Sequence, residues 1–111
     1  MAVVAVPQRF EVWLVNLDPT QGSEINKTRP CVVISPDELN RYLRTVTIAA
    51  LTSAPRSYPS RVACEFQGKA GQVAPDHIRS VDKTRLIRKL GALTAAEAQL
   101  VCDRLIELFQ Y

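Results

Sequence analysis

The chain has 111 residues, with 14 basic and 11 acidic side chains and a formal net charge of +3. This length predicts a single domain over residues 1–111 with one hydrophobic core, and the modest positive charge favours an anionic partner but lacks the long like-charge runs of a disordered nucleic-acid tail. No stretch approaches the roughly 18 to 20 apolar residues of a membrane span. Met1–Pro7 lacks the basic residues and the length of a secretory signal. We therefore expect a cytoplasmic protein without a membrane partner, and we expect residues 1–8 to fray or to pair at a sheet edge.

Short apolar runs separated by turn residues predict a small β-rich domain. The first strand is expected at Phe10–Leu17, and because it is apolar on both faces it should lie inside the sheet. The second is expected at Cys31–Ser35. The sequence Ser35-Pro36-Asp37-Glu38 then predicts a capping box that opens a short helix ending near Tyr42.

The middle of the chain alternates between apolar and polar residues. This pattern predicts strands at Thr45–Thr52 and Arg61–Phe66. The segment between them, Ser53–Ser60, is too long and too polar for a tight hairpin and is a candidate binding loop. Gly68 and Gly71 mark the next turn. Shorter strands are predicted at Gln72–Ala74, Ile78–Val81 and Ile87–Leu90.

The last segment predicts a helix. It opens with a second capping box, Thr94-Ala95-Ala96-Glu97, and an apolar stripe at helical spacing should pack on the sheet. Leu100 and Ile106 fall outside the stripe and are either scattered surface residues or contacts with a second subunit. The predicted fold is therefore mainly β (α+β), with a curved antiparallel sheet of five to seven strands and a C-terminal helix. The stripe consists of Ala98, Val101, Cys102, Leu105, Leu108 and Phe109.

The cysteines Cys31, Cys64 and Cys102 are odd in number, far apart and set among apolar residues. This pattern predicts buried free thiols in a reducing compartment, not disulfides. His77 is the sole histidine, and there is no Cys-x-x-Cys pair, so the usual zinc ligand sets are missing. We expect neither a metal nor a cofactor.

Arg29 follows a polar loop that starts at Gly22 and directly precedes an apolar strand. Pro30 biases Arg29 towards extended backbone and away from helical dihedral angles. A guanidinium oriented in this way suits a phosphate or a carboxylate, although an arginine in this position also serves as an ordinary surface ion-pair residue.

Three motifs give the chain a specific resemblance. Val12–Thr20, Gly22–Glu24 and Thr28–Pro36 occur in the order and at the spacing of the MazF/PemK family of toxin endoribonucleases. The resemblance implies a small SH3-like antiparallel β-barrel with appended helices, a homodimer, and metal-independent, sequence-specific cleavage of single-stranded mRNA. It also implies a cognate MazE-like antitoxin whose tail masks the RNA groove. Weaker similarity continues through Leu51–Ser53, Tyr58–Pro59 and Val73–Val81.

The resemblance places the family's catalytic pair on Arg29 and Thr52 and its acidic loop residue on Glu24. The PemK branch has a histidine and an arginine where this chain has Ser23 and Ala74, so the chain resembles the MazF branch more closely and the PemK acid-base scheme is not carried over. The residues expected to contact RNA are Ser23, Asn26, Lys27, Thr28, Ser53, Arg56, Tyr58, Asp76, His77 and Arg79.

Metal-free RNA cleavage uses the substrate's own 2′-OH as nucleophile and leaves a 2′,3′-cyclic phosphate and a 5′-OH. Arg29 suits stabilisation of the phosphate charge, because a side chain with a pKa above about 12 is a poor proton donor. The general-acid role that the family suggests for it stays open. Thr52 would donate its hydroxyl to a non-bridging oxygen, and Glu24 is either the general base or a solvated loop residue.

Other residues leave alternatives open. Arg56 and Tyr58 combine a phosphate partner with a stacking face, as single-strand RNA binders do, or belong to a solvated loop. His77 beside Asp76 is either a base or a structural residue. The competing function is a non-catalytic module on the same scaffold, either an RNA binder or a gyrase poison similar to CcdB, whose Trp-Gly-Ile chain end is missing here. A basic cluster is either a charged outer face or a second RNA site: Lys83, Arg85, Arg88 and Lys89.

Overall fold

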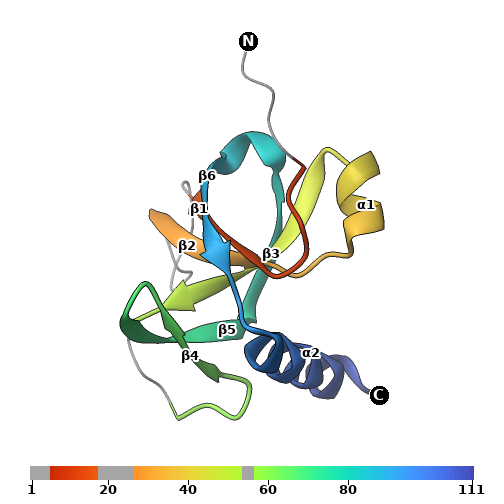
Figure 1. Cartoon of the computed structure of the whole chain (residues 1–111). Helices are drawn as coiled ribbons and strands as arrows, with labels where there is room; N and C mark the ends of the chain where they lie inside the picture. The colour runs from red at the N-terminus through yellow and green to blue at the C-terminus, as the bar shows by residue number, and fades with distance from the viewer. Residues whose placement is uncertain (1–5, 18–26, 54–56) are drawn as a thin grey trace.

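The computed structural model describes residues 6–17, 27–53 and 57–111. Within these residues six strands form one antiparallel sheet in the order β4-β5-β3-β2-β1-β6 (Figure 1). None of the helices in these ranges is both long and apolar enough to span a membrane. The strands are β1 (Glu11–Asn16), β2 (Thr28–Val33), β3 (Thr45–Thr52), β4 (Val62–Phe66), β5 (Lys69–Asp82) and β6 (Leu86–Ala92), and the helices are α1 (Asp37–Tyr42), the short 3-10 helix η1 (Lys83–Arg85) and α2 (Ala95–Phe109).

The sheet curls until its edge strands approach each other. Phe66 on β4 packs against Gly91 on β6, where a Cβ would lie only 3.0 Å from the ring. The two edge strands are not hydrogen-bonded neighbours, so the predicted barrel is a strongly curled, open sheet. The mainly β class and the C-terminal helix are confirmed.

Alternation along the strands divides the buried side chains into two clusters. Trp13 and Val15 of β1 lie in the first cluster, and Val12 lies in the second, so β1 is buried on both faces as predicted. Val101 of α2 completes the second cluster. The first cluster also contains Leu17, Cys31, Val33, Val46, Ile48, Ala50, Val81 and Leu86, and the second contains Val32, Ile34, Ala49, Leu51, Val62, Cys64 and Val73.

Most strand boundaries differ from the predictions by one to three residues, and two of these differences have a clear cause. Phe10 precedes β1 because its φ of 70° is incompatible with a strand, while its N–H donates to the Val33 carbonyl at 2.6 Å. The second strand starts at Thr28, three residues before the predicted start, because Arg29 pairs with Val15 of β1. Arg29 therefore lies inside a strand.

The predicted capping box at Ser35 is wrong. Pro36 is the N-cap of α1, and no side chain caps that helix. The Ser35 hydroxyl instead donates to Asn40 Oδ1 at 2.6 Å and accepts the Thr47 N–H at 3.0 Å. Asn40 is fully buried, so satisfying its amide takes precedence over capping a six-residue helix.

The two strands predicted within residues 72–81 are parts of one long strand, β5. Ala50 of β3 pairs with Ala74, but its neighbour Ala49 pairs with Ile78, so residues 75–77 are left out of the ladder as a bulge. Gly68 forms the turn before β5 with a φ of 75°, whereas Gly71 lies within the strand. The bulge directs Asp76 and His77 away from the regular pairing.

Helix α2 begins with the predicted capping box. Thr94 Oγ1 accepts the Glu97 N–H at 3.2 Å, and Glu97 Oε1 accepts the Thr94 N–H at 2.9 Å. The second Glu97 oxygen accepts the Glu65 N–H of β4 at 3.0 Å, which ties the helix to the sheet edge. The prediction that Leu108 and Phe109 pack on the sheet is wrong. Both are exposed, since the last turn extends beyond the sheet (Figure 1).

The cysteine prediction holds for two of the three thiols. All three are free; Cys31 and Cys64 are buried, but Cys102 on α2 is partly exposed. Burial is the main cause that raises the pKa of Cys64 to about 11, and the nearby Glu97 carboxylate adds to it. Leu100 and Ile106 on the same helix are exposed, as expected for residues outside the apolar stripe.

A buried carboxylate holds the segment before β1. Glu11 accepts hydrogen bonds from the Gln8 N–H at 2.7 Å and the Trp13 Nε1–H at 3.0 Å, and Lys89 Nζ lies 2.8 Å from its second oxygen. Burial alone would raise the pKa of Glu11, but the hydrogen bonds from Lys89, Gln8 and Trp13 hold it below its usual value. Residue 8 is thus anchored by a side chain; residues 1–5 lie outside the described residues.

Candidate active site

The register of β2 and β3 places Arg29 and Thr52 opposite each other. Cys31 pairs with Ala50, and continuing this antiparallel register by two residues brings Arg29 to Thr52. Directly opposite residues share a face of the sheet, and Cys31 and Ala50 both belong to the first cluster. Arg29 and Thr52 therefore lie on the first-cluster face, where β3 ends and β2 begins.

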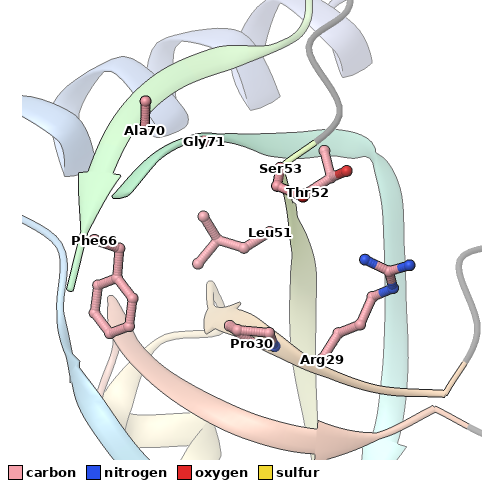
Figure 2. Close-up of a pocket in the computed structure, with 8 residues that line it drawn as sticks. All are labelled: Arg29, Pro30, Leu51, Thr52, Ser53, Phe66, Ala70 and Gly71. Atoms are coloured by element: carbon pink, nitrogen blue, oxygen red, sulfur yellow. The ribbon is translucent and has the colours of Figure 1, made fainter. Parts of the chain in front are cut away.

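A pocket of about 210 Å³ lies beside this pair, and both residues contribute to its lining. In Figure 2 the Leu51 side chain points towards Phe66, whereas the Arg29 guanidinium and the Thr52 hydroxyl lie on the opposite side of β3. The rest of the lining is mainly apolar. The chemistry that the sequence predicts therefore belongs to the first-cluster face. The pocket is lined by Arg29, Pro30, Leu51, Thr52, Ser53, Phe66, Ala70 and Gly71.

Two guanidinium groups act on the same buried thiol. Burial raises the pKa of Cys31 to about 12, while the positive charges of Arg29 and Arg79 oppose this rise. Arg79 pairs with Ile48 of β3, a member of the first cluster, so Arg79 lies on the first-cluster face together with Arg29. At such a pKa Cys31 is a neutral thiol at pH 7 and is not a nucleophile.

Arg79 also contacts the residue that follows β1. Its Nη1 donates to the Leu17 carbonyl at 3.2 Å, and the Leu17 N–H donates to the Lys27 carbonyl at 3.0 Å. Lys27 has a φ of 67°, which is uncommon for a residue other than glycine. Leu17 and Lys27 are thus tied together beside Arg79. Four predicted site residues lie outside the described residues: Ser23, Glu24, Asn26 and Arg56.

Asp76 does not join Arg29 and Thr52; it is paired with Arg61. Arg61 Nε and Nη2 donate to the two Asp76 oxygens at 2.8 and 3.0 Å, and His77 Nε2 lies 3.7 Å from Asp76 Oδ2. The hydrogen bonds from Arg61 lower the pKa of Asp76, against the opposing effect of burial and with further help from the charges of Arg61 and His77. Asp76 is therefore held as a carboxylate.

The predicted residues thus form two groups. Arg29, Thr52 and Arg79 share the first-cluster face, with Ser53 directly after Thr52. The second group is Tyr58, Asp76 and His77, which lie around Arg61, a residue not predicted from the sequence. The sequence shows only that Arg61 begins an alternating strand. Its pairing with Asp76 could not be predicted, because Asp76 lies 15 residues away in the bulge of β5. No group of three potential metal ligands occurs among the described residues.

The fold belongs to a known structural class of toxins. The structure of MazF from Deinococcus radiodurans superposes with a TM-score of 0.86 at 28% identity, covering 97% of this chain and all of that one. A MazE–MazF structure from the same organism matches with a TM-score of 0.80 at 26% identity, covering 96% of this chain and 98% of that one.

Sequence comparison is more specific. Residues 8–109 match the family model described as the PemK-like, MazF-like toxin of type II toxin-antitoxin systems. The endoribonuclease MazF9 of Mycobacterium tuberculosis is 36% identical over 104 residues, which cover 84% of this chain and 88% of that protein. The chain belongs to the PemK/MazF family of type II toxins.

Proposed function

We propose that the chain is a toxin that cleaves single-stranded mRNA at specific sequences without a metal ion and thereby stops translation. The observation that supports this most is that Arg29 and Thr52 lie opposite each other on one face, at the open end of β2 and β3. The mycobacterial relative named as an endoribonuclease also supports RNA as the substrate.

In the proposed reaction the substrate supplies the nucleophile. The 2′-oxygen attacks the neighbouring phosphorus, so an O2′–P bond forms and the P–O5′ bond breaks. A base removes the 2′-OH proton, and the departing 5′ oxygen gains a proton. The products are a 2′,3′-cyclic phosphate and a 5′-OH. The protein has to place the strand, stabilise negative charge at phosphorus and move two protons.

Arg29 stabilises the charge that develops on the non-bridging oxygens. Its planar guanidinium donates two parallel hydrogen bonds, and its side chain stays protonated throughout the reaction. Thr52 donates its hydroxyl to the same phosphate. Both residues are half-buried at the ends of paired strands, so little reorganisation is needed on binding. Removing Arg29 should lower the rate on the order of 100-fold or more.

Glu24 is the proposed general base, on the family resemblance alone. An exposed glutamate with a pKa near 4.3 is a weak base, so RNA binding would have to raise that pKa. The pH-rate profile of Glu24→Gln tests the assignment. The variant should lose the acid limb of the profile, and an unaltered limb with an unaltered rate would remove Glu24 from this role.

The remaining contacts follow the two groups of residues. Lys27, Thr28, Ser53 and Arg79 would hold the strand at the first-cluster face, because Lys27 and Thr28 lie at the start of β2, Ser53 follows β3, and Arg79 contacts Leu17, which is bonded to Lys27. His77 would contact RNA beside the bulge. Ser23, Asn26 and Arg56 complete the proposed set from the sequence.

Two protein partners are also proposed. A mycobacterial endoribonuclease solved in complex with its cognate antitoxin, and the MazE–MazF structure, support a cognate antitoxin that resembles MazE. On the family resemblance, its tail would cover the RNA-binding face. The chain is also proposed to form a homodimer, which would bury apolar side chains that α2 leaves exposed. Phe109→Ser should lower the molar mass measured by light scattering at micromolar concentration if α2 contributes to that interface. The exposed apolar side chains of α2 are Leu100, Ile106, Leu108 and Phe109.

The deciding experiment incubates the purified protein with a mixed-sequence single-stranded RNA in EDTA. Wild type should cut at a short sequence, while Arg29→Ala and Thr52→Val should be slowed on the order of 100-fold and 10-fold. Arg44→Ala and Thr45→Val are matched controls, because both residues are exposed at the opposite end of β3.

A DNA strand of the same sequence should survive, since it lacks the 2′-OH. Cleavage of DNA would refute the mechanism, and intact RNA with folded wild type would refute the enzyme. The ends formed are checked by treatment with kinase and phosphatase, which distinguish a cyclic phosphate with a 5′-OH from the products of direct hydrolysis.

A further inference from the structure

Arg61 connects the loop before β4 to the bulge of β5. Besides its paired hydrogen bonds to Asp76, its guanidinium carbon lies 5.1 Å from the centre of the Tyr58 ring. Its backbone N–H closes a turn on the Tyr58 carbonyl at 3.0 Å, and Ser60 Oγ donates to Asp76 Oδ1 at 3.2 Å. One arginine thus fixes a turn, a ring and a carboxylate.

The Tyr58 ring is held but not covered. The guanidinium lies over the ring, yet 53% of the residue remains exposed. Pro59 favours the turn because its fixed φ suits the second position of a β-turn. An aromatic ring that is fixed in place and accessible to solvent suits the stacking of an unpaired base, which is a frequent mode of single-strand recognition.

The register places this cluster level with the end of β3. Arg61 directly precedes β4, whose first residue, Val62, pairs with Val73 of β5. Val73 pairs in turn with Leu51 of β3, the residue before Thr52. The cluster is two strand spacings, or about 10 Å, across the sheet from β3.

Arg61 itself is not placed to bind RNA. Its side chain is only 7% exposed, and the Asp76 carboxylate, which is 32% exposed, neutralises its charge. A phosphate would have to displace the paired Asp76 carboxylate to reach a guanidinium that is itself nearly buried. Asp76 is likewise occupied on both oxygens. Of this cluster, the Tyr58 ring is the group presented to a ligand.

We infer that Tyr58 is a stacking platform for an unpaired base near the scissile bond, and that Arg61 is a positioning residue that fixes this ring through its paired hydrogen bonds to Asp76. The inference rests on the proposed function for the identity of the ligand as a single strand. It gives Asp76 the role of a counter-ion, so Asp76 is neither a proton carrier nor a reader of bases.

The test uses short oligothymidylate strands, each with one 2-aminopurine, because DNA cannot be cut through a 2′-OH and 2-aminopurine fluorescence falls when the base stacks. Wild type should bind with quenching at one position of the strand. Tyr58→Leu and Arg61→Met should each raise the Kd about 5-fold to 100-fold and abolish that quenching. Tyr58→Phe keeps the ring and should retain both, and Arg44→Ala is the matched control for loss of a cation.

A second readout separates positioning from general loss of structure. With single-stranded RNA in EDTA, Tyr58→Leu should raise KM by a similar factor and leave kcat within about 2-fold, because stacking binds ground state and transition state alike. Arg61→Lys keeps the charge but not the paired geometry, and should fall between wild type and Arg61→Met. If Arg61→Met fails to fold in a thermal melt, Tyr58→Leu decides, because its side chain is exposed.

Normal binding and quenching by Tyr58→Leu would overturn the inference, as would absence of quenching by wild type. Normal binding by folded Arg61→Met would overturn the role of Arg61. If wild type binds the DNA strand through Tyr58 but leaves RNA intact, the stacking platform stands and the proposed cleavage fails. If RNA is cut while Tyr58→Leu behaves as wild type, the proposed cleavage stands and the stacking platform fails.

Discussion

Gly71→Ala should slow cleavage by displacing Thr52 without unfolding the protein. A Cβ at residue 71 would lie 3.1 Å from the Thr52 carbonyl oxygen, and ordinary contact begins near 3.4 Å, so the backbone of Thr52 must yield by about 0.3 Å. A misplacement of 1 Å in a catalytic site costs on the order of 100-fold, so a shift of this size should cost about 4-fold to 10-fold in kcat/KM.

Stability should change much less than the rate. Replacing glycine by alanine stabilises by about 0.4 to 1 kcal/mol through the unfolded chain, and the close contact at Thr52 offsets this gain. The free energy of unfolding, measured in urea, should therefore stay within about 1 kcal/mol of wild type. Initial rates on single-stranded RNA in EDTA give kcat/KM.

Gly91→Ala is the matched control for this experiment. A Cβ there would lie 3.0 Å from the edge of the Phe66 ring, which can rotate or shift, and would not touch Thr52. It should cost stability but not rate. The reasoning is refuted if Gly71→Ala retains full kcat/KM, or if Gly91→Ala loses as much activity as Gly71→Ala does.

Three other sets of substitutions test the contacts that hold the fold. Ile48→Ala truncates a side chain that is 1% exposed and should lower the free energy of unfolding by about 3 kcal/mol in urea; a loss below about 1 kcal/mol would contradict the assigned core. Thr94→Ala should lower the free energy of unfolding by about 1 kcal/mol. Glu97→Ala should lower it more, because the second Glu97 oxygen also accepts the Glu65 N–H. If Thr94→Ala instead had the lower melting temperature, the hydrogen bond from Glu65 to Glu97 would not stabilise the fold. Glu11→Gln should destabilise at pH 7. The difference should shrink as the pH falls below the unfolded pKa of about 4.3 and should be lost below the folded pKa, which is lower still; a gap independent of pH would count against this role of Glu11.

Much of the fold could be predicted because alternation and capping are local signals. Thr45–Thr52 and the start of α2 were predicted at the observed residues. The errors arise where a distant contact overrides a local preference. Ser35 does not cap α1, because its hydroxyl donates to the buried Asn40. Phe109 is exposed because α2 extends beyond the sheet, and helical spacing in the sequence does not show how far the sheet extends.

The candidate site was predictable in part for the same reason. Arg29 was selected from its position before Pro30 and an apolar strand, and the family resemblance added Thr52 as its partner. Their opposition follows from the pairing of two strands, which neither strand shows alone. Arg61 could not be selected, since its significance depends on a bulge that brings Asp76 to it from the neighbouring strand. Residues that act through such a partner have no motif of their own in the sequence.

The proposed chemistry depends on strand register more than on the shape of the surface. Side chains alternate along β2 and β3, so a slip of one residue in both strands would present Pro30 and Leu51 on the first-cluster face in place of Arg29 and Thr52. The pocket beside the pair is lined mainly by apolar residues, with Pro30 and Leu51 among them. What prevents the slip is the packing of the next residues: Cys31 in one cluster requires that its neighbours Pro30 and Val32 point to the other. The same buried alternation that stabilises the sheet therefore directs the guanidinium and the hydroxyl to one side, and core substitutions that loosen this pairing should reduce cleavage before they unfold the chain.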